Sequence, residues 1–165
     1  MIEVKKVAVV IMALATVMIV LPFSTVFAGS PMIEVSGTIT SGGTGTTVVK
    51  EAADNHFLFI TTASTWSGGI SGSTTGSQTW IAHKYGPPPE SVNINVELHF
   101  TTATVDGKTG TMTIEMNMIA FPAHPSDNHG TWRIKDAEGG LEGLHGEGAW
   151  LSNPNRYEGK VHFSK

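Results

Sequence analysis

The 165-residue chain contains no cysteine and few charged side chains. Without disulfide bonds, a domain of this size must be held by its core and by closure of its sheets. Charged residues make up 15% of the chain, and no stripe of basic residues accompanies the formal net charge of −4. Because binding to nucleic acid requires such a stripe, no nucleic-acid partner is expected. The sequence also lacks a Gly-x-Ser-x-Gly elbow, a phosphate-binding loop and a cysteine nucleophile.

Only one long apolar run is present, from Val7 to Leu21. Two lysines precede it, and small side chains at Val26 and Ala28 follow it, a pattern typical of a secretory signal peptide cleaved after Ala28. The run is shorter than the roughly 20 residues of a membrane span. We therefore expect a signal peptide over residues 1–28 and one domain over residues 29–165. That domain would be secreted or extracytoplasmic, without membrane contact after cleavage; a retained anchor is the alternative.

Residues 29–165 combine frequent glycines with short stretches in which apolar and polar residues alternate. All 19 glycines of the chain fall in this part, and two-residue alternation is typical of half-buried strands. Eight or nine strands with short connections predict an all-β fold, specifically a small antiparallel eight-stranded barrel, because sheets of that size tend to close. A two-sheet sandwich is the alternative. Expected turns include residues 41–45 and 136–142, with a stiff proline-rich connector over residues 86–89 and a loop over residues 120–129.

The strongest local signal is a hairpin over residues 94–118. A three-residue turn, Val105-Asp106-Gly107 with a bulge at the glycine, keeps all apolar side chains of both arms on one face. The predicted apolar pairs are Phe100 with Met112, Leu98 with Ile114, Val96 with Met116 and Ile94 with Met118. The other face carries Asn95 opposite Asn117, Glu97 opposite Glu115 and His99 opposite Thr113.

Glu97 and Glu115 are the candidate catalytic residues, together with Arg133 on the next strand. Like charges directly opposite each other on a sheet must be solvated, neutralised or share a proton. One alternative is an exposed cluster in which Arg133 neutralises the pair. The other places the cluster in the lumen, where a carboxyl with a raised pKa acts as acid or base and Arg133 holds an anion.

Glycines in the last third of the chain carry a family resemblance. Residues 138–148 read Glu-Gly-Gly-Leu-Glu-Gly-Leu-His-Gly-Glu-Gly, and Asp-Gly-Lys-Thr-Gly-Thr and Gly-Thr-Trp stand at residues 106–111 and 130–132. This pattern resembles the prokaryotic branch, of unknown function, of the allene-oxide-cyclase-like barrels, over about residues 92–163. Ala137 and Glu138 depart from it. The resemblance implies a calycin-like barrel, often homo-oligomeric, whose lumen confines an unsaturated lipid or phenolic substrate; it assigns no catalytic residue. Independently, glycines at 143, 146 and 148 would permit close backbone approach.

Three functions remain open. The first is binding of a small hydrophobic molecule in the lumen, the second is a cyclase or isomerase that confines its substrate, and the third is a filled barrel serving as a structural or interaction module. No cofactor is expected. A metal site on the loop with His124, Asp127 and His129 is disfavoured, because the spacing fits no zinc pattern. The expected ligand-binding residues are Leu98, Phe100, Met112, Ile114, Met116 and Trp132.

Overall fold

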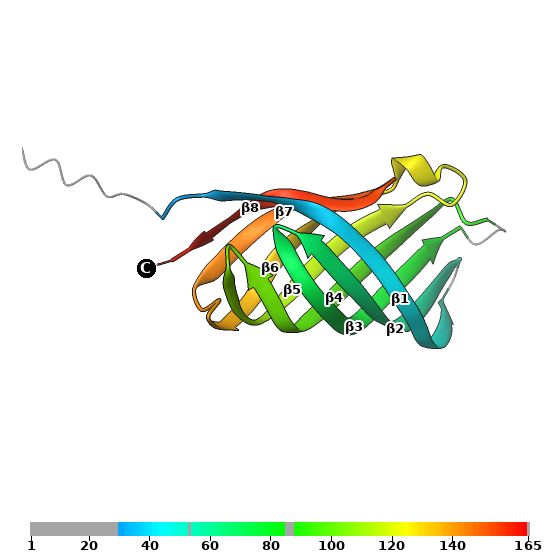
Figure 1. The fold of residues 1–165 in the computed structure, drawn as a ribbon. Coiled ribbons are helices and arrows are strands. Elements are labelled where there is room, and N and C mark those ends of the chain that lie inside the picture. The colour runs from blue at the N-terminus through cyan, green and yellow to red at the C-terminus, as the bar shows by residue number, and fades with distance from the viewer. Residues whose placement is uncertain (1–29, 53, 85–87, 165) are drawn as a thin grey trace, which may run out of the picture.

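A computed structural model describes residues 30–52, 54–84 and 88–164, with the backbone alone for residues 43–48, and these residues form a closed antiparallel barrel (Figure 1). The predicted all-β fold with eight strands is confirmed for the described residues. The signal peptide and residues 86 and 87 of the proline-rich connector lie outside them. In barrel order the elements are β1 (Ile33–Ala52), β2 (Asn55–Gly68), β3 (Ile70–His83), β4 (Ser91–Val105), β5 (Lys108–Ala120), β6 (His129–Gly139), β7 (Leu144–Ser152) and β8 (Asn155–Phe163), with a short 3-10 helix, η2 (Pro125–Asp127), before β6.

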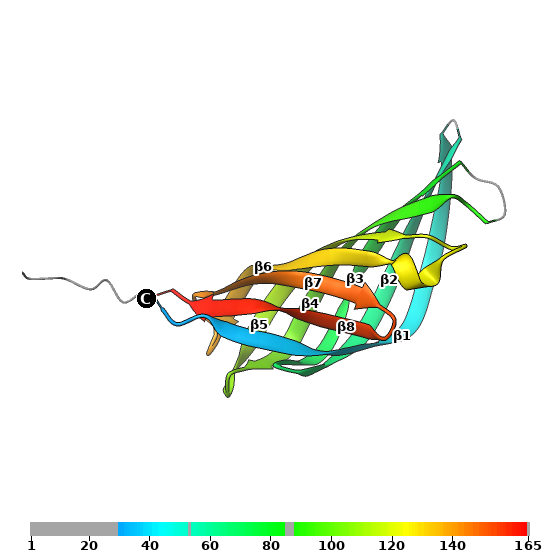
Figure 2. The same cartoon turned by 90° about the horizontal axis from the view of Figure 1, so that it is seen from above.

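The barrel closes at one end and is flared at the other. β1 pairs with β8 only from Ile33 to Thr38, and its remaining residues pair with β2 alone. The β1–β2 hairpin therefore projects beyond the ring, as Figure 2 shows. The turn predicted at residues 41–45 is wrong, because β1 continues through this glycine-rich stretch with two register shifts between Gly42 and Thr47. Residues 136–139, also predicted as a turn, extend β6.

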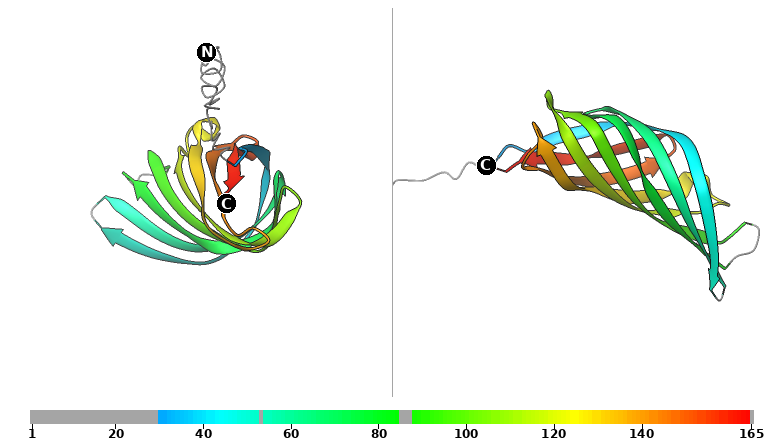
Figure 3. Two further views of the ribbon diagram at one scale, coloured as in Figure 1. Left: turned by 90° about the vertical axis from the view of Figure 1, so that its left-hand side faces the viewer. Right: turned by 90° about the horizontal axis from the view of Figure 1, so that it is seen from below.

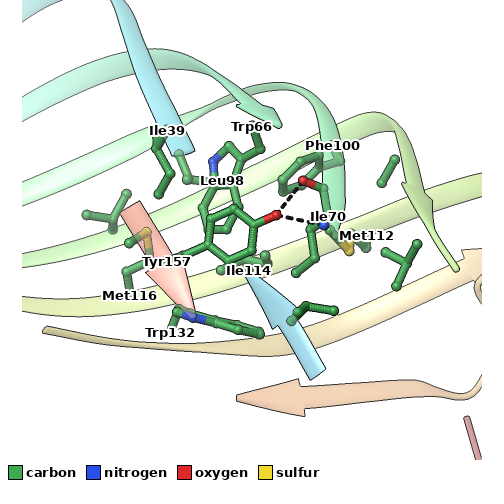
Figure 4. Close-up of a cluster of buried hydrophobic side chains, with 14 of the residues drawn as sticks. Ile39, Trp66, Ile70, Leu98, Phe100, Met112, Ile114, Met116, Trp132 and Tyr157 are labelled. Atoms are coloured by element: carbon green, nitrogen blue, oxygen red, sulfur yellow. Dashed lines mark hydrogen bonds between the residues drawn. The ribbon is translucent and has the colours of Figure 1, made fainter. Parts of the chain in front are cut away.

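The interior of the closed end is filled by aromatic side chains (Figure 4). The ring of Trp66 lies 5.6 Å from that of Phe100 and 4.7 Å from that of Tyr157, measured between centroids. Trp132 packs edge-on against Tyr157 from the other side. All four side chains are buried. Aromatic side chains contribute large buried areas, so this aromatic plug supplies much of the core.

Tyr157 also ties β8 to the turn between β2 and β3. The Ile70 amide donates to the Tyr157 hydroxyl at 2.7 Å, and the hydroxyl donates to the Ile70 carbonyl at 2.7 Å. The tyrosine passes over β1 at Gly37, where an added Cβ would lie 2.6 Å from the hydroxyl oxygen and 1.8 Å from the carbonyl oxygen of Ser67. Glycine is thus required at position 37, because Tyr157 and the Ser67 carbonyl lie too close to leave room for a side chain.

The hairpin of β4 and β5 has the predicted register but a different turn. The four apolar pairs and the three polar pairs are all confirmed. The turn, however, contains two residues, Asp106 and Gly107, with φ of 50° and 73°, and Val105 pairs with Lys108. Two residues with positive φ suit the twist of a tight hairpin. A bulge at Thr101 and Thr102 supplies the extra residue that keeps the apolar face inward.

Glycines on β7 and β8 allow the strands to approach the core as expected. A Cβ at Gly148 would lie 2.7 Å from the Trp132 ring, and one at Gly159 would lie 2.5 Å from it. A Cβ at Gly146 would meet Val161 at 2.5 Å, and Gly143 has a φ of 76°. The indole of Trp132 therefore packs directly on the backbone of β7 and β8 at Gly148 and Gly159, where a side chain would collide with it.

Candidate functional site

The wide half of the barrel interior contains a cavity of about 70 Å³. It lies beyond the aromatic plug, inside the ring of strands that Figure 3 shows from two further sides. Strands from most of the barrel contribute to its wall. The lining residues are Ile39, Ser41, Thr62, Ser64, Gln78, Val96, Leu98, Met116, Met118, Trp150 and Asn155.

The cavity has one apolar wall and one polar wall. β4 and β5 supply the apolar wall through valine, leucine and methionine side chains. β2 and β3 supply the polar wall, where Thr62 and Ser64 are buried and the Ser64 hydroxyl bonds the Thr74 hydroxyl at 2.6 Å. Gln78 accepts a hydrogen bond from the Trp80 indole at 2.7 Å. Six of the eleven lining residues are apolar and five are polar, so the cavity offers a small molecule both apolar surface and hydrogen-bonding groups.

No charged side chain lines this cavity within the part of the chain that the structure describes. Burying an isolated carboxylate or ammonium group is strongly unfavourable unless an opposite charge is present. The lining thus suits an uncharged occupant.

An apolar surface leads from the cavity to the flared end. One cross-strand row on the inner face joins Val49, Leu58, Trp80, Ile94 and Met118. Ile94 is buried, whereas Val49 at the rim is 55% exposed. Apolar side chains at the rim of a lumen give a hydrophobic molecule a contact surface continuous with the interior.

The predicted ligand-binding residues all face the interior, but only two of them line the cavity. Leu98 and Met116 contribute to its apolar wall. The other four, Phe100, Met112, Ile114 and Trp132, are buried in the filled half of the barrel. Alternation grouped the hairpin residues of this set on one apolar face without showing which face lies inward, and it does not show where along the barrel axis side chains leave space.

Glu97, Glu115 and Arg133 lie on the outer face, so the alternative that placed them in the lumen is wrong. Their strand neighbours Leu98 and Ile114 point inward, and successive side chains alternate between faces. Arg133 donates to Glu115 from Nε at 2.9 Å and from Nη2 at 2.5 Å. These are the contacts of the exposed, neutralised cluster.

Lys135, two residues beyond Arg133 on β6, is a further member of this cluster that was not among the candidate residues. Its Nζ lies 2.5 Å from a Glu97 carboxylate oxygen and 3.0 Å from one of Glu115. Hydrogen bonding to Lys135 lowers the pKa of Glu97, and hydrogen bonds from Arg133 and then Lys135 lower the pKa of Glu115. A general acid requires the opposite shift.

The loop before β6 does not bring its histidines together around a common point. Among the described residues, no group of three or more His, Cys, Asp or Glu side chains is placed to hold a metal ion. His129 instead bonds the backbone carbonyl of Asp127 through Nδ1 at 2.7 Å, and its ring stacks on Phe121.

The polar wall of the cavity was not predicted. Thr62, Ser64 and Gln78 lie on strands whose threonines and serines look like ordinary surface residues in the sequence. Every second residue of a strand points to the same face, so the apolar residues Ile60 and Trp66 would have placed Thr62 and Ser64 on the inner face as well.

The comparisons with known proteins support the fold. A crystal structure of a protein of unknown function from the DUF3224 family of Shewanella oneidensis MR-1 is similar over 82% of this chain and 99% of that chain, with a TM-score of 0.61 and 15% identity. No protein-family model matches the chain, and no curated protein does. No helix in the described residues is long and apolar enough to cross a membrane. The resemblance to allene-oxide-cyclase-like barrels is not tested by these findings and stays a prediction.

Proposed function

We propose that the protein binds a small hydrophobic molecule in the wide half of its barrel. The observation that carries this proposal is a cavity with an apolar wall that continues onto the apolar inner face of the flared end. Buried apolar area is the main source of affinity for such ligands.

The two halves of the interior differ in how they are filled. Trp66, Phe100 and Trp132 occupy the closed half, whereas Ser64 and Thr62 occupy comparable inward positions in the wide half. An eight-stranded barrel has room for its own side chains or for one small ligand. Small side chains at these positions leave the space that the proposal requires.

The cavity sets an upper size for the enclosed part of the ligand. An engineered apolar cavity of about 150 Å³ holds benzene. At about 70 Å³, this cavity encloses only a few non-hydrogen atoms. The remainder of the ligand would lie against Leu58, Trp80 and Val49 at the open end.

The cyclase or isomerase alternative has less support. Acid–base catalysis in the lumen needs a titratable group there, and none lines the cavity among the described residues. The third alternative, a structural or interaction module, is an outcome of the test below. We also propose export to the exterior, on the signal-peptide pattern of residues 1–28 alone.

Binding is tested with the neutral probes ethylbenzene and hexane and with protein labelled at its methionine methyl groups. We expect the methyl resonances of Met116 and Met118, which line the cavity, to move, and that of Met112, in the filled half, to stay. Val96→Phe fills the cavity and should abolish both shifts. Asn95→Phe, the same replacement at the adjacent outward position, should not.

Absence of any shift at Met116 and Met118, with either probe at saturation in water, would contradict the proposal and leave the structural module. Equal shifts in wild type and Val96→Phe would also contradict it, because they would place the probe elsewhere.

A further inference from the structure

The four tryptophan side chains of the protein differ in how their indole N–H groups are satisfied. Trp80 donates to Gln78 at 2.7 Å, Trp150 to Asn155 at 2.6 Å, and Trp132 to the carbonyl of Glu158 at 3.2 Å. Trp66 is the exception: its Nε1 is buried without any hydrogen-bond partner among the described residues. Buried tryptophan N–H groups normally have a partner, so this one requires an explanation.

The position of Trp66 connects this donor to the proposed ligand site. Trp66 is only 1% exposed and forms part of the aromatic plug; it does not itself line the cavity but lies beside residues that do. Its cross-strand partner is Ile39, and Ser64 lies two residues away on the same face of β2; both line the cavity. In Figure 4 the indole nitrogen is turned toward Ile39 and away from the Tyr157 hydroxyl.

We propose that Trp66 Nε1 is the hydrogen-bond donor for the inner end of the ligand, and that this end carries an uncharged acceptor such as a ketone, ester or ether oxygen. The inference rests on the proposed function and specifies its ligand class. A hydrocarbon would leave the donor unsatisfied, whereas a carbonyl oxygen accepts from it and places its carbon chain along the apolar wall.

The other groups around the cavity support an uncharged acceptor. The lining contains no Lys or Arg to neutralise a carboxylate and no Asp or Glu to neutralise an amine, within the described part of the chain. The Ser64 hydroxyl is already bonded to Thr74. Charged ligands would therefore lose hydration without gaining an ion pair.

The test uses ethylbenzene and acetophenone, which have the same size and differ by one carbonyl group, with benzoate and benzylamine as charged analogues. In a nitrogen–proton correlation spectrum of the whole protein, we expect acetophenone to move the Trp66 indole proton downfield. Ethylbenzene should not, and the Trp80, Trp132 and Trp150 indoles should keep their hydrogen bonds with both ligands. Trp66→Phe identifies the resonance by its loss.

Affinities give a second measurement. Loss of one hydrogen bond of the usual strength corresponds to about a fivefold change. Trp66→Phe should thus weaken acetophenone at least about fivefold more than it weakens ethylbenzene, a comparison that cancels the effect of the enlarged cavity. If Trp66→Phe does not fold, the spectra of the wild-type protein test the inference. The Trp66 resonance is then assigned as the indole signal that remains in each of the variants Trp80→Phe, Trp132→Phe and Trp150→Phe.

The outcomes separate the two proposals. Binding of both neutral probes with an unmoved Trp66 resonance would overturn the acceptor inference, leave hydration by a buried water as the explanation and preserve the proposed function. Tighter binding of benzoate or benzylamine than of acetophenone would overturn the uncharged class. Failure of every probe to bind would overturn the proposed function itself.

Discussion

Replacement of Tyr157 by phenylalanine tests whether the barrel depends on the hydroxyl that joins β8 to the β2–β3 turn. The substitution keeps the ring, which packs between Trp66 and Trp132, and removes only the oxygen. Two buried hydrogen bonds to Ile70, both 2.7 Å long, are lost. Because each leaves a buried backbone group without a partner, we expect a loss of about 2–3 kcal/mol in the free energy of unfolding.

Urea unfolding followed by tryptophan fluorescence measures this loss as a lower midpoint with an unchanged slope. For a domain of this size the melting temperature should fall by roughly 6–12 °C. Thr38→Val is the matched control, since it removes a hydroxyl whose bond to Ser67 is exposed, and it should change the stability by less than about 0.5 kcal/mol. If Tyr157→Phe were as stable as this control, the hydroxyl would not hold the two elements together.

Three further predictions concern the outer cluster, the glycines and the N-terminus. The pKa of Glu115 is lowered in the folded protein. Its ion pair with Lys135 therefore contributes fully to folding stability above the ordinary pKa of 4.5, and this contribution is lost as the pH falls through the lower pKa of the folded state. The difference in urea midpoint between wild type and Lys135→Met should therefore be largest near neutral pH and disappear in acid; an equal difference at both would refute this. Gly107→Ala should cost about 1 kcal/mol through its positive φ alone, because nothing lies within 4 Å of the added Cβ. Gly110→Ala should cost more, because its Cβ would lie 2.1 Å from the Glu138 carbonyl oxygen; calorimetry showing the reverse order would contradict the geometry. N-terminal sequencing of the exported protein should give Gly29 as the first residue. If residues 1–28 are still present, the segment is a retained anchor and not a cleaved signal peptide.

The pattern of alternation predicted the fold and the long hairpin because burial of one face is a strong constraint. Each arm has a continuous apolar face, and a slip of one residue would expose all of it. The same constraint does not distinguish a three-residue turn from a two-residue turn with a bulge at Thr101 and Thr102, since both give the same parity. The register could thus be predicted, but the turn could not.

The high glycine content of one stretch led to a wrong prediction of a turn. Residues 41–45 contain three glycines and were expected to turn, yet β1 runs through them because pairing with β2 continues on both sides. The candidate site was found in part for a related reason. Leu98 and Met116 belong to a continuous apolar face, whereas Thr62 and Ser64 are polar residues that only the closed barrel places inside.

The bulge at Thr101 and Thr102 has a consequence for how this part of the gene can change in length. The bulge also appears in the pairing of β4 with β3, where Ser73 pairs with Thr102 and Thr74 with Phe100. Deleting one of the two threonines would leave a single residue opposite Thr111, so Phe100 would still pair with Met112 and Ala103 with Gly110 on the inner face. Deleting His99 instead would bring Glu97 inward in place of Leu98. Single deletions should therefore be tolerated at the bulge and be eliminated by selection in the regular part of β4.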